Sequence, residues 1–220
     1  MEDLLLPLFP LEVALLPEEP LPLHIFEDRY KRMINDCLKA QAKEKGQEEF
    51  GVIFVKDQEI KAVGCSARII NVTRKYSDGR MDIFTVGTRR FEVLATHAED
   101  GTTPYMRASV AFFEDDPGCD TPAEPDAVHA IELFRKIVQK LHKTADMPIH
   151  LPKPYRCLSF RIAAALPFDL DFKQELLAVR NETERLGQVT DVIEVLFPQI
   201  EMVQKTQSKA GGNGNAGIQS

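Results

Sequence analysis

The chain has 220 residues, of which 44% are hydrophobic and 28% are charged. These are ordinary globular values, so they exclude wholesale disorder, collagen and coiled coils, and the length suits one domain with or without a smaller appendage. The formal net charge of -7 disfavours nonspecific binding to nucleic acid, because an acidic surface repels phosphate groups.

The first residues after the N-terminus are rich in leucine and proline. Proline excludes a continuous helix, so the short apolar runs between the prolines predict short strands. These runs are residues 4–6, 13–16 and 21–26, with a turn at 17–20. The period then changes, and apolar residues at helical spacing predict an amphipathic helix over 27–45.

The next part of the chain is rich in β-branched residues and predicts longer strands. Ser77-Asp78-Gly79 has the composition of a tight turn, because glycine accepts a positive φ, and Gly87 is expected to mark a bulge. The strands are predicted at 50–55, 63–76, 80–96 and 106–113. Together they predict a mostly antiparallel sheet that curls into a small barrel.

Acidic residues, glycine and proline cluster between residues 115 and 125, which predicts a boundary between two lobes. We therefore expect a β-rich lobe with one helix at 1–116, an α-helical lobe at 117–204 and a disordered tail at 205–220. Helical spacing in the second lobe predicts four helices. They are at 128–141, at 155–166, after a cap at Asp171, and after a cap at Asn181, the last being kinked or ended by Pro198.

Four cysteines are spread along the chain without a CxxC pair. This pattern predicts free thiols in a cytoplasmic protein rather than a zinc ribbon or a disulfide framework. The N-terminus begins Met-Glu-Asp without basic residues, and prolines interrupt the apolar stretch that follows. We therefore expect neither a signal peptide nor contact with a membrane.

The sequence lacks the short motifs of common enzymes. It has no GxxxxGK[ST] phosphate loop, no GxGxxG after a strand, no HExxH and no GxSxG. The mid-strand Cys65 suits a small core residue better than a nucleophile, since nothing beside it in sequence lowers the pKa of a thiol. We therefore expect no catalytic residues, no cofactor and no metal.

Arg89-Arg90-Phe91 is the one compact basic and aromatic element. Such a group can contact a phosphate and stack on a base. Strand alternation places Arg89 and Phe91 on one face of the sheet and Arg90 on the other, which also fits one buried phenylalanine flanked by exposed arginines. The first interpretation makes Arg89 and Arg90 candidate nucleic-acid contacts, and the second gives them no ligand.

A series of short motifs follows a specific order between about residues 4 and 200. They are PLFPL at 7–11, LPLHIFE at 21–27, RY at 29–30, DCL at 36–38, FGV at 50–52, VGCSARI at 63–69, DGR at 78–80, GTRRF at 87–91, LSFR at 158–161 and KQELL at 173–177. Each motif is weak alone, but the ordered set resembles the Lon N-terminal domain, also called the Lon substrate-binding domain. Glu18 departs from the family pattern, in which glycine follows the proline, so we expect that turn to differ in shape.

The resemblance implies an α+β fold, with a twisted, mostly antiparallel, β-barrel-like lobe of the PUA-like type followed by an α-helical lobe. In full-length Lon proteases this region precedes an ATPase domain and a Ser–Lys protease domain, and it helps to capture unfolded or tagged polypeptides. Neither a Walker motif nor a protease domain is present in this sequence. The resemblance therefore implies a noncatalytic, stand-alone bacterial protein that binds polypeptides, with other proteins of a proteolysis system as further partners.

Two hypotheses about binding follow. The first is that an exposed apolar patch beside a groove between the lobes captures polypeptides, with His24, Phe26, Arg29 and Tyr30 as contributors; packing of these residues between the lobes is the competing explanation. Strand addition at a sheet edge is a further mode of capture. The second hypothesis is RNA or nucleotide binding at Arg89 and Arg90, which rests on the PUA-like fold and which the acidic net charge opposes.

Overall fold

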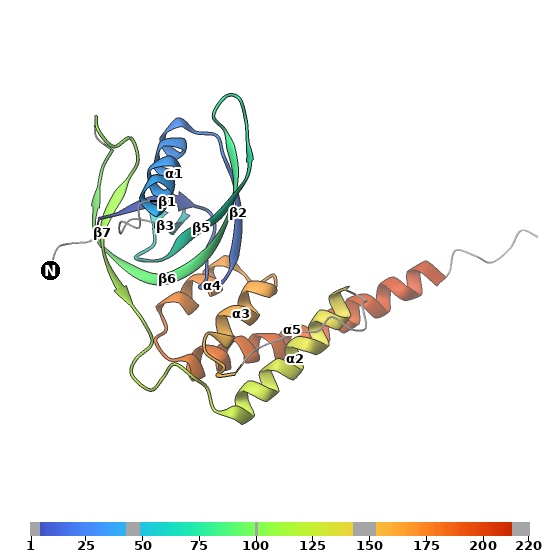
Figure 1. Cartoon of the computed structure of the whole chain (residues 1–220). Coiled ribbons are helices and arrows are strands. Elements are labelled where there is room, and N and C mark those ends of the chain that lie inside the picture. Colours follow the sequence, from blue (N-terminus) through green and yellow to red (C-terminus); the bar gives the residue numbers. More distant parts are fainter. Residues whose placement is uncertain (1–4, 43–48, 100, 143–152, 213–220) are drawn as a thin grey trace, which may run out of the picture.

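The structure is a computed structural model that describes residues 5–42, 49–99, 101–142 and 153–212. Figure 1 shows a β-rich lobe with one helix, followed along the chain by a helical lobe. The described elements are β1 (Leu5–Leu11), β2 (Pro20–Ile25), α1 (Asp28–Gln41), β3 (Glu49–Lys56), β4 (Glu59–Ile60), β5 (Val63–Lys75), β6 (Met81–His97), β7 (Arg107–Phe113), α2 (Glu124–His142), α3 (Leu158–Ala165), α4 (Leu170–Ala178) and α5 (Glu182–Gly212). The predicted α+β fold is confirmed.

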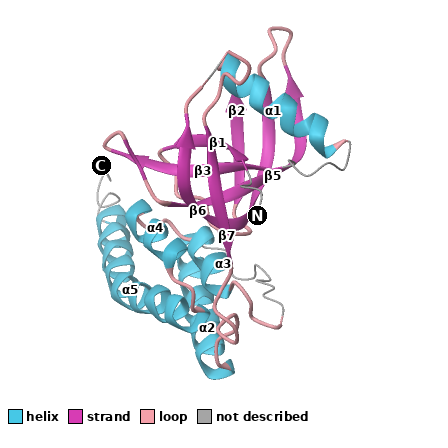
Figure 2. Cartoon of the chain, turned by 90° about the vertical axis from the view of Figure 1, so that its left-hand side faces the viewer, coloured by secondary structure: helices cyan, strands magenta, loops and turns pink. Residues whose placement is uncertain are grey.

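Five of the strands close into a ring. Strand β1 pairs in parallel with β3 and antiparallel with β7, while β6 and β5 join β7 to β3 on the other side. A small apolar cluster that includes Leu6, Leu8 and Phe91 packs among these strands. The ring has the barrel-like form that the strand pattern predicts, and Figure 2 shows the helical lobe gathered at one end of it.

The β5–β6 hairpin extends beyond this ring, and β2 joins its far part. Residues Met81 to Val86 of β6 pair with β2 on one side and with β5 on the other. Helix α1 packs on the inner side of this three-stranded extension through buried residues that include Met33 and Ile34. The hairpin turns at Gly79, whose φ of 84° is the positive value that the turn sequence predicts.

The predicted bulge at Gly87 is present. Ala67 of β5 pairs with Gly87, but Cys65 pairs with Arg90, so β6 carries one extra residue between these points. Gly87 also meets the segment before β2 at very close range: a Cβ atom there would lie 2.1 Å from the carbonyl oxygen of Leu16. Only glycine allows this approach of two backbones.

The opening segment differs from the prediction in two ways. Residues 13–16 are not a strand, and β1 continues through Pro7 and Pro10. The prolines are tolerated because β1 pairs with β7 only up to Pro7 and then continues along β3. Residues 14–16 are buried for another reason, because they pass between the two lobes.

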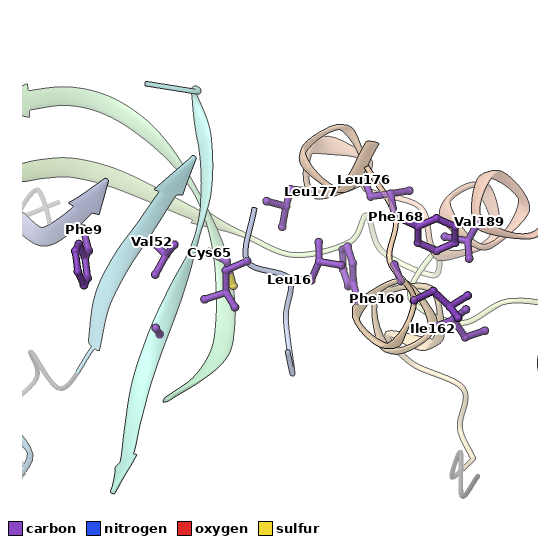
Figure 3. Close-up of a cluster of buried hydrophobic side chains, with 14 of the residues drawn as sticks. Phe9, Leu16, Val52, Cys65, Phe160, Ile162, Phe168, Leu176, Leu177 and Val189 are labelled. Carbon is purple, nitrogen blue, oxygen red and sulfur yellow. The ribbon is translucent and has the colours of Figure 1, made fainter. Parts of the chain in front are cut away.

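One hydrophobic core runs through both lobes. Figure 3 shows Leu16 between Cys65 of the sheet and Phe160 of α3, with Leu177 of α4 close by. These side chains belong to a single cluster of buried residues that reaches from α1 to α5. The predicted division at residue 116 therefore separates two kinds of secondary structure that share one core. That the two lobes are separate domains stays a proposal.

The helical lobe follows the predicted order with different ends. Asp169, and not Asp171, caps α4, because its side chain accepts a hydrogen bond from the Asp171 N–H at 2.9 Å. Asn181 accepts from the Glu184 N–H at 3.2 Å, as the predicted capping box requires. Helix α5 does not end at Pro198 but continues to Gly212, beyond the predicted limit of the lobe at 204. Proline removes one backbone donor, but α5 continues through it without a break. Residues 213–220 of the predicted tail lie outside the described part.

Candidate functional site

Four buried charged side chains meet where the β lobe joins the helical lobe. Arg90 of β6 donates to Asp115 at 2.6 Å, and Arg185 of α5 donates to both oxygens of Asp115 at 2.5 and 2.7 Å. Arg185 also donates to Glu182 at 2.6 Å, and the hydroxyl of Ser159 donates to Glu182 at 2.7 Å. We call these five residues the junction network. It fixes the lobes to each other, because a buried charge is tolerated only when it is paired.

The two carboxylates of the junction network are held differently. Burial by itself would raise the pKa of Asp115, but hydrogen bonds and charges from Arg185 and Arg90 outweigh it and lower that pKa below its ordinary value. For Glu182, burial dominates and raises the pKa above its ordinary value, despite hydrogen bonds from Ser159 and Arg185. Asp115 is thus the carboxylate that both arginines share, and Glu182 is a second partner of Arg185.

A second set of ion pairs joins the lobes around the turn before β2. Glu18 accepts two hydrogen bonds from Arg161 at 2.5 and 3.1 Å, and Glu19 accepts one from Lys173 at 2.6 Å. Glu18 has a φ of 65°, in the left-handed region that favours glycine, so it takes the conformation that glycine adopts most readily. The lobes are thus tied at several points, and the groove between them has fixed walls.

That groove is a cavity of about 910 Å³ on the outside of the junction network. Its apolar lining includes Phe112 and Phe113 at the end of β7 and Phe160 of α3. The acidic segment 114–118 forms one rim. Besides Arg90, the lining contains two arginines that are each paired with a carboxylate. Arg89 lies 3.2 Å from Glu49, and Arg156 lies 2.9 Å from Asp120.

The two arginines proposed for nucleic acid lie in different environments. Arg89 is exposed and stacks over the ring of Phe112 at 3.8 Å. Arg90 is only 5% exposed and donates to two backbone carbonyls in addition to Asp115. The expectation that exposed arginines flank a buried Phe91 is therefore wrong for Arg90, because the bulge after Gly87 interrupts the strict alternation and Asp115 provides a buried partner.

A different surface gathers exposed apolar side chains. Phe26 is 59% exposed, Ile70 is 52% exposed and Phe84 is 36% exposed. Pro22 pairs directly with Phe84, and Asn71 beside Ile70 pairs with Phe84 from the other side, so these residues lie on one outer face of β2, β6 and β5. We call the exposed residues Pro22, His24, Phe26, Ile70 and Phe84 the distal face.

His24 is held in place on the distal face. Its Nδ1 lies 2.5 Å from Asp82 Oδ1, and the hydroxyl of Tyr76 donates to Asp82 Oδ2 at 2.9 Å. The hydrogen bond from His24 is the main reason why the pKa of Asp82 lies below its ordinary value. The His24 ring also stacks on Phe26 with centroids 6.0 Å apart, so the exposed phenylalanine extends from an ordered cluster.

The structure brings only two of the four predicted polypeptide-binding residues together. Tyr30 is buried and packs on Phe9 with ring centroids 4.1 Å apart, so it belongs to the core. Arg29 is exposed but pairs with Glu27 and Glu99 at 3.0 and 2.9 Å. His24 and Phe26 share the distal face, which they form with Ile70 and Phe84, two residues that we did not predict. The exposure of Phe84 could have been predicted from the sequence, since Phe84 follows the buried Ile83 in the alternation of the strand.

The distal face does not border the groove between the lobes. Strand β2 starts at Pro20, beside the turn that contacts the helical lobe, and it carries His24 near its other end, where the β5–β6 hairpin turns (Figure 1). The predicted patch and the predicted groove therefore both exist, but at opposite ends of β2.

The edges of this part of the sheet are poor templates for an added strand. Among the described strands, β2 pairs only with β6, and Pro20 and Pro22 leave two of its six residues without a backbone donor. On the other side, the pairing of β5 with β6 shifts register between Ile69 and Asn71 and again between Val72 and Arg74. Such irregularities bend and twist an edge. The faces of the strands are therefore better placed for binding than their edges.

Three of the described thiols, those of Cys37, Cys65 and Cys157, are poor nucleophiles. Burial raises the pKa of Cys37 to about 12 and that of Cys157 to about 11, and it raises the pKa of Cys65 as well. Within the described ranges, no group of three histidine, cysteine or acidic side chains is placed to hold a metal ion. Nor does any helix in those ranges have the length and apolar character needed to cross a membrane.

Comparison with known proteins assigns the fold to a family. The family model of the ATP-dependent protease La (LON) substrate-binding domain matches residues 5–195. The chain belongs to this family. Among curated proteins, the Lon protease of Solibacter usitatus is 23% identical over 211 residues, which cover 93% of this chain but 26% of that protein. The chain thus spans about a quarter of the length of this relative.

Solved structures of the LON substrate-binding domain family agree with the architecture. A Lon N-terminal domain protein from Xanthomonas campestris superposes with a TM-score of 0.64 at 25% identity, covering 84% of this chain and 96% of the other. The N-terminal domain of a Mycobacterium avium complex Lon protease superposes with a TM-score of 0.58 at 15% identity, covering 86% and 98%. The second similarity supports the fold alone, and the predicted family is confirmed.

Proposed function

We propose that this chain binds unfolded or tagged polypeptides in the cytoplasm through its distal face, and that it does so without catalysing a reaction. The observation that carries the proposal is the group of exposed apolar side chains on β2, β6 and β5, with Phe84 at its centre and Phe26 just after the end of β2. Membership of a substrate-binding domain family supports the same function.

The chemistry of an unfolded chain suits this face. Unfolded polypeptides expose apolar side chains that folded proteins bury, and aromatic residues provide a large contact area at a small cost in conformational entropy. Phe26 is already positioned by the stack on His24, and His24 by Asp82, so little ordering is needed when a ligand arrives. Several weak apolar contacts of this kind also tolerate many sequences, which a capture module requires.

The test measures the binding of a labelled polypeptide that cannot refold, such as reduced and alkylated lactalbumin, by fluorescence anisotropy. The variant Phe26→Ala/Phe84→Ala removes two rings from the distal face. We expect its affinity to fall by about tenfold, since aromatic residues at the centre of an interface commonly contribute at least this much.

The matched control is Leu94→Ala/Val195→Ala, which removes two exposed apolar side chains elsewhere, on β6 and α5. We expect this control to bind as the unmodified protein does. Equal weakening of both variants would refute the assignment to the distal face, and the absence of saturable binding at high micromolar concentration would refute polypeptide binding altogether.

RNA or nucleotide binding has less support. Arg90 is neutralised by Asp115 in the junction network, and Arg89 is paired with Glu49, so neither arginine offers a free cation to phosphate. A single exposed arginine gives little of the electrostatic affinity on which phosphate recognition depends.

A further inference from the structure

The cations around the distal face show a feature that polypeptide capture alone does not require. Arg68 and Arg74 are exposed on β5, and among the described residues neither has a carboxylate within ion-pair distance. The guanidinium of Arg74 instead lies over the ring of Tyr76, 4.7 Å from its centroid. Most other exposed arginines of the described chain are paired, so these two stand out.

Both arginines belong to the outer face of the sheet. Arg68 pairs with Val86 and Arg74 pairs with Asp82, and these β6 positions alternate with the buried Ile83 and Thr85. Ile70 and Phe84 lie between them. At 3.3 Å per residue, the six steps along the chain from Arg68 to Arg74 span up to roughly 20 Å. The apolar centre of the distal face is therefore bracketed by two cations along β5.

The carboxylates opposite the two arginines are engaged by other partners. Glu49 pairs with Arg68 in register, but its side chain accepts from Arg89 and Ser66. Asp82 faces Arg74 in register, but His24 engages its Oδ1 and Tyr76 donates to its Oδ2. One oxygen of Asp82 is thus engaged by His24 of β2 and the other by Tyr76, which directly follows β5, so Arg74 acts on Asp82 through its charge without a direct ion pair. The net charge of -7 on the whole chain acts over longer distances, which salt screens beyond about 10 Å at 0.1 M.

We propose that the distal face selects extended polypeptide segments that have apolar residues at the centre and acidic residues on both flanks. This inference rests on the proposed function and specifies the class of polypeptide. The apolar centre packs on Phe84, Ile70 and Pro22, and the acidic flanks pair with Arg68 and Arg74. Since the edges of β2 and β5 are blunted, side chains carry the recognition, and the backbone of the ligand needs no strand pairing.

The experiment uses three labelled peptides of about ten residues, which extend to roughly 33 Å and so cover the face. They share one apolar centre and carry aspartate, asparagine or lysine on both flanks. We expect the aspartate peptide to bind about five- to tenfold more tightly than the asparagine peptide, and the lysine peptide to bind most weakly. This advantage should shrink at 1 M salt, where charges are screened within about 3 Å.

The variant Arg68→Gln/Arg74→Gln should remove the preference while leaving binding of the asparagine peptide unchanged. The control Arg135→Gln/Lys136→Gln makes the same change of charge on the exposed side of α2 and should keep the preference. Equal affinity for all three peptides would overturn the charge selection and leave the proposed function standing. If none of the peptides binds and the unfolded reporter also fails to bind, the proposed function itself falls.

Discussion

The junction network and the distal face place side chains in opposite environments. At the junction, charged groups are buried and nearly every donor has an acceptor, as with Arg185, which reaches both Asp115 and Glu182. On the distal face, large apolar side chains such as Phe26 are left in solvent. The first arrangement makes the relative position of the lobes rigid. The second contributes little to folding, and exposed apolar area of this kind is typical of interaction sites.

The largest expected effect is at the junction. Asp115→Asn leaves Arg90 and Arg185 buried without their shared counter-charge, so we expect the free energy of unfolding to fall by about 3–5 kcal/mol. Urea denaturation followed by circular dichroism measures this. The control Asp116→Asn changes a neighbouring exposed carboxylate, paired with Arg180 at 3.1 Å, and should cost at most about 1 kcal/mol. A loss below about 1 kcal/mol for Asp115→Asn would contradict the role of the junction network.

The close contact of Gly87 with the segment between the lobes gives the second effect. In Gly87→Ala the new methyl group would meet the Leu16 carbonyl, a backbone group that cannot turn away, so we expect a loss of about 3 kcal/mol. Gly187→Ala is the matched control, because it adds the same methyl group at an exposed position in α5 where nothing lies within 4 Å. That change should stabilise the protein by about 0.5–1 kcal/mol. Similar thermal midpoints for the two variants would contradict the prediction, because they would mean that the segment at Leu16 can move away from position 87 without a loss of stability.

The pH dependence of stability gives a smaller effect. The pKa of Asp115 is lowered in the folded state, so its contribution is present above the unfolded value near 4 and is lost as the pH falls through the folded pKa. The difference in unfolding free energy between the unmodified protein and Asp115→Asn should therefore narrow below about pH 4. Denaturation curves at a series of pH values measure this difference, and a constant gap down to about pH 2 would argue against the charged form of Asp115.

The smallest effect on stability is expected on the distal face. Phe26→Ala/Phe84→Ala should lower the free energy of unfolding by at most about 1–2 kcal/mol, because Phe26 is 59% exposed and Phe84, at 36% exposed, is only partly covered. The same variant is expected to lose most of the binding, which separates the two regions cleanly. A large loss of stability would mean that these rings support the sheet and that the contrast with the junction is wrong.

Much of the fold followed from patterns that are local in sequence. Helical spacing identified α1 and the helices of the second lobe, and the turn at Gly79 and the bulge at Gly87 followed from the conformational freedom of glycine. The errors came where distant segments meet. Residues 13–16 look like a strand because they are apolar, but their burial comes from the contact between the lobes.

The candidate site was less accessible for the same reason. His24 and Phe26 were predicted to be exposed contributors, and the structure adds Ile70 and Phe84 from strands that lie far along the chain. The burial of Tyr30 could have been predicted, since it lies at helical spacing with Met33 and Ile34 on the apolar face of α1, and its packing on Phe9 shows that it is buried.

The sequence by itself determined the family, most of the strands and helices in their order, and the glycines at the turn and the bulge. Those features depend on side-chain type and spacing over a few residues, which the chain carries locally. Only the tertiary structure decided that Arg90 is a buried partner of Asp115 and that Arg68 and Arg74 bracket an apolar face. A charge is paired or free according to the segments that fold against it, and those segments come from distant parts of the sequence.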